Sequence, residues 1–207
     1  TFGKPHTAAE GKTYGAFRMG RGQLFSFGVN VWETGPFSMA VDIKHAGLDY
    51  VLKREAESRP GCKIQVDLYD KLLPGDVAAE LRTIRRWVRY AQIPVYINGE
   101  NAAVDPSKEK WDHVTEECYL RLEEKGSLEV YNLGVHTMDI PGFKYGGCGV
   151  LVSKKQLKVN FARNDVQADC PVWKKIRPFV QTVVAAAVVA KPRLTADEQL
   201  RMCQLIA

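Results

Sequence analysis

The sequence predicts an α+β fold in which antiparallel strands come first and a mixed region of strands and helices follows. Between residues 29 and 68, apolar and polar residues alternate in short runs that Gly, Pro or Asp separate. An amphipathic segment with helical spacing follows, and the second half of the chain contains further strand-like runs and a long helical pattern rich in small residues. Strands and helices in this order are typical of the α+β class.

Length and composition restrict the class of protein. The chain has 207 residues, of which 45% are hydrophobic, and this suffices for one large domain or two small ones. The net charge of +5 is mild for a nucleic-acid-binding protein. The five cysteines are widely spaced without a zinc-binding pattern, so we expect reduced thiols in a cytoplasmic protein and no metal site in this chain. The first residues show no signal-peptide pattern, and no apolar run reaches membrane-spanning length, so no membrane partner is expected.

The first predicted elements are a loop, a short helix and four strands. Residues 1–23 are rich in Gly, Thr, Lys and His without periodicity, which indicates a loop, and residues 23–29 fit a short buried helix. The strand segments that follow form an antiparallel meander at residues 29–32, 37–43, 48–54 and 63–68.

A helix follows the strands. It begins after Pro74-Gly75, with Asp76 as its N-cap, and ends near Gln92. We expect one apolar stripe to face the core, made of Val77, Leu81, Ile84 and Val88. A second stripe consists of Arg82, Arg85, Arg86 and Arg89. This arginine stripe has two interpretations, a grip on phosphate or nucleic acid and a solvated outer face, and the second is the more common.

The second half of the chain combines strands and helices. Residues 93–100 predict a strand that runs into a turn, and a domain boundary is placed near Asp105-Pro106. Residues 107–124 form a charged segment, for which we expect a solvated helical face that includes Glu116-Glu117 and Glu123-Glu124. Strands are predicted near residues 128–131 and 149–152, a turn at 145–147 and a loop at 160–169. A helix is predicted from Pro171 to residue 191 with a kink at Pro178, and a further helix begins near residue 194.

A glycine-rich segment precedes the first helix. Gly15, Phe17, Gly20 and Gly22 lead into Ser26-Phe27, and glycines at such spacing let backbone amides approach a polyphosphate. These residues resemble the second glycine box of the GHKL ATPases, which include the heat-shock protein 90 chaperones, DNA gyrase, MutL and the MORC proteins. The family form is close to G-x-F-G-x-G-F-x-S, and this chain has one extra residue after Phe17.

The resemblance continues in order along the chain. Gly61-Cys62 stands where the family has Gly-Thr before a strand, so Cys62 replaces a threonine that lies near adenine. Residues 159–167 resemble the L-N-V-S-R-E-x-L-Q loop in the middle domain of heat-shock protein 90. That resemblance implies that Arg163 reaches the γ-phosphate of ATP and that Asn160 and Gln167 support the loop. The alternative is a surface arginine within the basic stretch from residue 154 to residue 177.

The resemblance implies a fold and a function. Residues 1–105 would be the ATP lid and the C-terminal half of a Bergerat ATP-binding domain, residues 106–192 the small α/β domain that follows it, and residues 193–207 the start of a further helical segment. Arg163 would be catalytic. The cofactor-binding residues would be Gly15, Phe17, Gly20, Arg21, Gly22, Cys62 and Gln167.

Several family elements are absent from this sequence: the helix with the water-activating Glu and the magnesium-holding Asn, and the adenine-reading D-x-G-x-G turn. We therefore expect a fragment of a heat-shock-protein-90-like ATPase that uses ATP with Mg²⁺ only within a longer protein. The chain alone is expected neither to bind ATP tightly nor to hydrolyse it.

Two alternatives stay open. A GHKL ATPase that acts on DNA is favoured by the arginine stripe and by the basic stretch, although the DNA-acting members typically sense phosphate with a lysine. A non-enzymatic scaffold that binds a partner protein fits Cys62 and the irregular glycine spacing. The expected partners are accordingly ATP, a client protein and a second copy of the chain, with DNA as the second choice.

Overall fold

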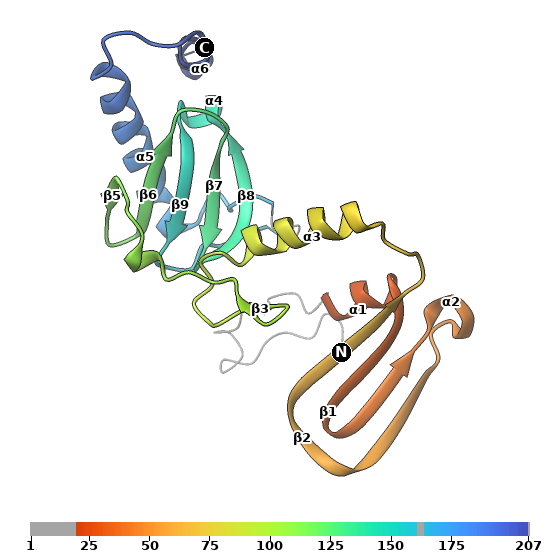
Figure 1. Ribbon diagram of the computed structural model, residues 1–207. Coiled ribbons are helices and arrows are strands. Elements are labelled where there is room, and N and C mark those ends of the chain that lie inside the picture. Colours follow the sequence, from red (N-terminus) through yellow and green to blue (C-terminus); the bar gives the residue numbers. More distant parts are fainter. Residues whose placement is uncertain (1–19, 161–163, 207) are drawn as a thin grey trace. The chain divides into compact units, whose positions relative to one another are not determined.

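The computed structural model describes residues 20–160 and 164–206 (Figure 1). The fold is of the mixed α+β class, as predicted. The chain divides into two compact units, Thr1–Asp76 and Val77–Ala207, each of which is described by itself. The division falls inside helix α3 (Pro74–Trp87), and the boundary predicted near Asp105 lies within the second unit.

The first unit contains a long two-stranded antiparallel ribbon. Strand β1 (Gly28–Val41) pairs with β2 (Tyr50–Leu68) from one end to the other, and the short helix α2 (Ile43–Ala46) connects them. The expected meander of four strands is therefore wrong, because the predicted segments are joined in pairs into two strands. The register shifts on both sides of Gly35, whose φ of 53° lets β1 change direction without ending there.

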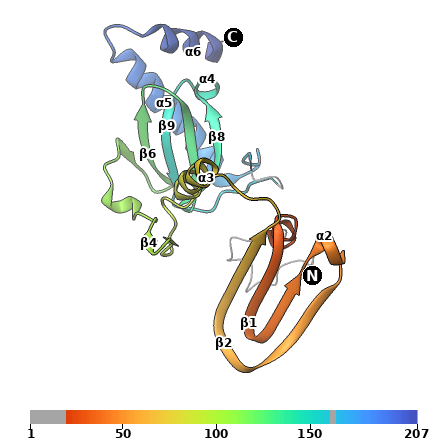
Figure 2. The same ribbon diagram turned by 45° about the vertical axis from the view of Figure 1, so that its right-hand side comes forward.

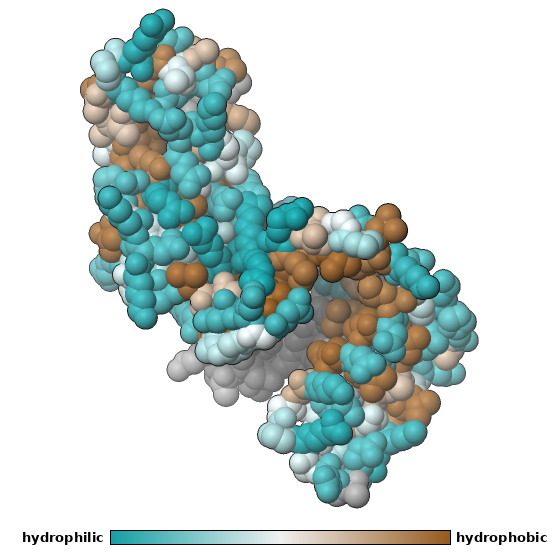
Figure 3. All heavy atoms as spheres, viewed as in Figure 1, coloured by the Kyte–Doolittle hydropathy of each residue, from teal (hydrophilic) through white to brown (hydrophobic). Residues whose placement is uncertain are grey.

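One face of this ribbon is apolar. Trp32 lies opposite Ile64, and Met39 lies opposite Leu52. Residues two apart along a strand share a face, and the register shifts at Gly35 bring Trp32 and Met39, which are seven residues apart, to the same side. Helix α1 (Gly20–Phe25) lies at one end of this face, where Phe25 contacts Trp32 edge-to-face with 5.9 Å between ring centroids. A hollow of about 380 Å³ is lined by Phe25, Trp32, Thr34, Phe37, Met39 and Leu52. Figure 3 shows such apolar side chains on the surface of the ribbon.

The second unit is built on a five-stranded sheet with the order β5-β6-β9-β7-β8. The strands are β5 (His113–Val114), β6 (Cys118–Glu123), β7 (Ser127–Asn132), β8 (Val135–Pro141) and β9 (Cys148–Ser153). Neighbouring strands are antiparallel except β7 and β9, which are parallel. The predicted strands near residues 128–131 and 149–152 are confirmed as β7 and β9.

The charged segment at residues 107–124 is not helical as expected. It forms a short 3₁₀ turn, η2 (Pro106–Lys108), and the strands β5 and β6. In β6 the buried Cys118 and Leu120 alternate with Tyr119 and Arg121, so the segment has the period of a strand and only its outer positions carry charge.

Helix α5 (Pro171–Val189) covers one face of the sheet, as Figures 1 and 2 both show. Its buried residues Trp173, Ile176, Val180 and Val184 share one core with the inward side chains of the strands. The helix begins at Pro171, as predicted, and continues through Pro178. The second unit also contains two shorter helices, α4 (Gly142–Tyr145) and α6 (Ala196–Ile206). A short hairpin is formed by the two-residue strands β3 (Tyr96–Ile97) and β4 (Glu100–Asn101), and it confirms the predicted strand and turn near residues 93–100.

Helix α3 does not bury the stripe that was predicted to face the core, and none of its described residues is fully buried. Of the stripe expected to be buried, Val77 is 40% exposed and Ile84 is 39% exposed, and Figure 3 shows apolar side chains along this helix. Arg86 instead approaches the sheet and pairs with Glu129 on β7 and Asp139 on β8. Carboxylates on this part of the sheet attract Arg86, so one arginine of the predicted outer stripe faces the sheet, while Arg82 stays exposed.

Candidate functional site

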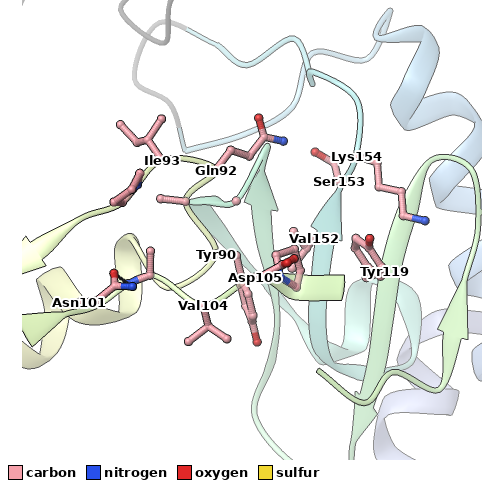
Figure 4. A pocket seen from close by; sticks show the side chains of 15 residues that line it. Tyr90, Gln92, Ile93, Asn101, Val104, Asp105, Tyr119, Val152, Ser153 and Lys154 are labelled. Atoms are coloured by element: carbon pink, nitrogen blue, oxygen red, sulfur yellow. Dashed lines mark hydrogen bonds between the residues drawn. The ribbon is translucent and has the colours of Figure 1, made fainter. Parts of the chain in front are cut away.

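A concave site of the second unit lies where the central strands β7 and β9 end. Because β7 and β9 are parallel neighbours, their last residues, Asn132 and Ser153, lie side by side at the same edge. A pocket of about 510 Å³ opens beside this edge (Figure 4). Ligand sites commonly lie at the carboxyl ends of parallel strands, so this edge is the candidate site. The pocket is lined by Tyr90, Ala91, Gln92, Ile93, Pro94, Asn101, Ala103, Val104, Asp105, Pro106, Tyr119, Gly134, Val152, Ser153 and Lys154.

Backbone atoms form one wall of the pocket. The turn from β7 to β8 passes through Leu133 and Gly134, which have φ values of 50° and 87°. A Cβ atom at Gly134 would lie 1.7 Å from the carbonyl oxygen of Tyr90, so the two backbones meet directly. The buried Ser153 accepts a hydrogen bond from the Leu133 amide at 3.2 Å and ties the turn to the end of β9.

The pocket carries one cation and one anion. Lys154 Nζ donates to the carbonyl oxygen of Thr115 at 2.5 Å and lies 4.2 Å from the centroid of the Tyr119 ring. Asp105 Oδ1 accepts hydrogen bonds from the hydroxyl and the amide of Ser107, which hold the pKa of this carboxyl below its usual value. Both charged groups of the pocket therefore already have partners within the second unit.

A carboxylate cluster fixes the chain beside the pocket. Glu109 accepts hydrogen bonds from the Tyr90 hydroxyl at 2.9 Å, from Arg89 at 3.1 Å and from Arg121 at 3.2 Å. Burial and the Glu109 carboxylate raise the pKa of Tyr90 to about 12. Partial burial acts to raise the pKa of Glu109, but the hydrogen bonds from Arg89 and Tyr90 outweigh it and lower that pKa.

The loop after β9 is held at its base by side chains. Gln167 N donates to the carbonyl oxygen of Lys158 at 2.8 Å, and Gln167 Nε2 donates to that of Val159 at 3.1 Å. The side chain of Asn160 accepts from the amide of Asn164 at 3.1 Å and donates to its side-chain oxygen at 2.8 Å. The two arms of the loop are thus bonded to each other on both sides of residues 161–163.

The structure describes only some of the predicted site residues. Gly15, Phe17 and Arg163 lie outside the described residues. Gly20, Arg21 and Gly22 form the first turn of α1 in the first unit. Cys62, in the same unit, is an exposed free thiol on β2 opposite Thr34, and Gln167 lies at the loop base in the second unit. Among the predicted residues, Asn160 and Gln167 both lie at the base of the loop after β9.

Most of the arginine stripe and part of the basic stretch form ion pairs within the second unit. Arg85 pairs with Glu100, Arg86 with Glu129 and Asp139, and Arg89 with Glu109. In the basic stretch, three lysines also have acidic partners: Lys155 has Glu116 and Glu117, Lys158 has Asp169, and Lys175 has Glu117. Most of these acidic partners are distant in sequence from their cations, so no local sequence pattern predicts the ion pairs.

Sequence reasoning missed the residues that build the pocket edge. Asn132, Ser153 and Lys154 meet only because β7 and β9 are neighbours, and no motif marks them. Among the described residues, no group of three or more His, Cys, Asp or Glu side chains is placed to hold a metal ion. No helix within the described ranges combines the length and the apolar character needed to cross a membrane.

No protein-family model matches the chain, and no curated protein matches its sequence significantly.

Proposed function

We propose that this chain is part of a heat-shock-protein-90-like GHKL ATPase in which the loop after β9 carries Arg163 to the terminal phosphate of ATP. The observation that supports this most directly is the construction of the loop base. Hydrogen bonds from Gln167 and between Asn160 and Asn164 hold the two arms on either side of residues 161–163. An arginine that follows a fixed anchor within three residues loses little freedom when it binds a phosphate.

The chemistry of such an arginine is electrostatic. A guanidinium placed against the transferring phosphoryl group stabilises the charge that spreads over its oxygens. In this proposal the backbone around Gly15, Phe17, Gly20, Arg21 and Gly22 lies near the phosphates and Cys62 near the adenine. Arg163 approaches when the ATP-binding part and the second unit close on each other.

The test is ATP turnover by the natural full-length protein with Arg163→Ala. We expect turnover to fall at least tenfold while the affinity for ATP stays within about twofold, since the arginine acts mainly on the transition state. Lys174→Ala is the matched control, because this exposed lysine on α5 lies in the same basic stretch. Unaltered turnover in Arg163→Ala would refute the role.

A second measurement concerns the 207-residue chain alone. We expect calorimetric titration with a non-hydrolysable ATP analogue and Mg²⁺ to show no binding. Micromolar binding would contradict the proposed division of the nucleotide site. DNA binding whose affinity falls steeply with salt would favour the DNA-acting alternative, and a partner protein bound without any ATP effect would favour the scaffold.

A further inference from the structure

Asn132 connects the end of β7 to the beginning of the loop after β9. Its Oδ1 accepts a hydrogen bond from Leu157 N at 2.8 Å, and its Nδ2 donates to the carbonyl oxygen of Leu157 at 3.1 Å. One side-chain amide thereby satisfies both backbone groups of a residue 25 positions away, as a neighbouring strand would. Asparagine is suited to this task because its amide carries a donor and an acceptor side by side.

Leu157 is a fixed point from which the loop departs. Its side chain is 2% exposed and belongs to the core beneath α5. The next residue, Lys158, donates its amide to Cys170 Sγ at 3.3 Å, and its carbonyl oxygen accepts from Gln167 N at 2.8 Å. Asn132 therefore holds the first arm of the loop, and the second arm is bonded to the first.

We infer that Asn132 is a positioning residue for the loop after β9, a role that rests on the proposed function of that loop. Without the side-chain amide, two backbone groups of Leu157 lose their partners, and a poorly solvated unpaired group is costly. The first arm then loses its hydrogen bonds to β7. It keeps the packing of Leu157, the bond from Lys158 N to Cys170 Sγ and its bonds to Gln167. The loop base becomes mobile while the sheet and α5 stay intact.

Hydrogen exchange of the 207-residue chain tests the structural half of this inference. In Asn132→Ala we expect the amides of Asn160 and Gln167, which bond across the loop, to exchange at least tenfold faster. Asn132→Asp keeps the acceptor for Leu157 N and loses the donor, so it should give an intermediate rate. Ser127→Ala, at the opposite end of β7, is the control and should change neither rate.

Two results would overturn this part. Unchanged exchange of the loop amides would show that Asn132 does not hold the loop. An equal acceleration in β9, α5 and the loop would show that Asn132 stabilises the whole unit and does not act on the loop in particular.

Turnover by the natural full-length protein tests the functional half. We expect Asn132→Ala to lower kcat at least fivefold with KM within about twofold, and to cause no further loss when Arg163→Ala is already present. Additive losses would overturn positioning through the loop. If Arg163→Ala alone leaves turnover unchanged, the proposed function fails, whereas faster loop exchange in Asn132→Ala would still show that Asn132 holds the loop.

Discussion

The carbonyl oxygen of Tyr90 occupies the space where a side chain at Gly134 would begin. An added Cβ would lie 1.7 Å from that oxygen and 2.4 Å from its carbon. Gly134 therefore allows the end of the α3 segment to rest on the β7–β8 turn, and this contact forms a wall of the pocket.

Gly134→Ala should destabilise the second unit strongly. The steric overlap with Tyr90 and the left-handed φ of 87° together should cost about 2–5 kcal/mol of unfolding free energy. Gly99→Ala is the matched control, because Gly99 has a φ of 83° and no atom within 4 Å of an added Cβ. Its cost should be only about 1–2 kcal/mol. Denaturant unfolding measures both, and equal costs would contradict the close approach to Tyr90.

Tyr90 should ionise only in strong alkali. Burial and the hydrogen bond to Glu109 raise its pKa to about 12. A raised folded-state pKa means that the stabilisation is complete below the unfolded value of about 10 and is lost as the pH rises toward about 12. A difference titration of tyrosinate absorbance between wild type and Tyr90→Phe measures this pKa. Glu109→Gln should lower it, because the carboxylate that disfavours the phenolate is removed; a Tyr90 pKa near 10 in the wild type would be inconsistent with the cluster.

Glu198 should make helix α6 sensitive to acid. Its carboxylate accepts from Lys191 Nζ at 2.5 Å and from Thr195 N at 2.8 Å, and these bonds lower its pKa to about 2. A lowered folded-state pKa means that this stabilisation is present above the unfolded value of about 4.3 and is lost as the pH falls toward about 2.

Amide exchange in α6 across this acidic range should therefore accelerate in the wild type relative to α5. Glu198→Gln should show weaker α6 protection at neutral pH and no such acid step. Asp197→Asn changes an exposed carboxyl of the same turn and should leave the acid step in place. An acid step that persists in Glu198→Gln would assign it to another group.

Arg86 should contribute to the stability of the second unit more than its neighbour Arg82. Arg86 pairs with Glu129 and with Asp139, whereas Arg82 lies exposed on the same helix. Because these groups are partly exposed, we expect Arg86→Ala to cost only about 0.5–1 kcal/mol, and less at high salt. Arg82→Ala should change the unfolding free energy by less than about 0.5 kcal/mol. Equal effects of the two substitutions would contradict the ion pairs.

Local patterns predicted the elements that depend on residues close to one another in the sequence. The first turn of α5 follows from Pro171, the turn between β3 and β4 from Asn98-Gly99, and the buried strand β9 from an apolar run. Which face of α3 turns toward the sheet was not predictable in this way, because the carboxylates that attract Arg86 come 43 and 53 residues later in the sequence.

The same limit explains what was missed at the candidate site. In β6 the charges of Arg121 and Glu123 concealed the alternation that starts at Cys118. The contact between Asn132 and Leu157 depends on the parallel pairing of β7 with β9, which a single sequence does not reveal. Asn160 and Gln167 were found only because a family resemblance pointed to their loop.

The strand order of the second unit has a consequence for its synthesis. β9 lies between β6 and β7, yet it is the last of the five strands to leave the ribosome. The β7–β8 hairpin can close from local contacts as soon as it is made, whereas β6 has an unpaired edge until β9 arrives. We expect pulse-labelled exchange to protect β7 and β8 before β6. Until Ser153 has emerged, the nascent chain therefore carries an open sheet edge to which a chaperone or a second nascent chain can bind.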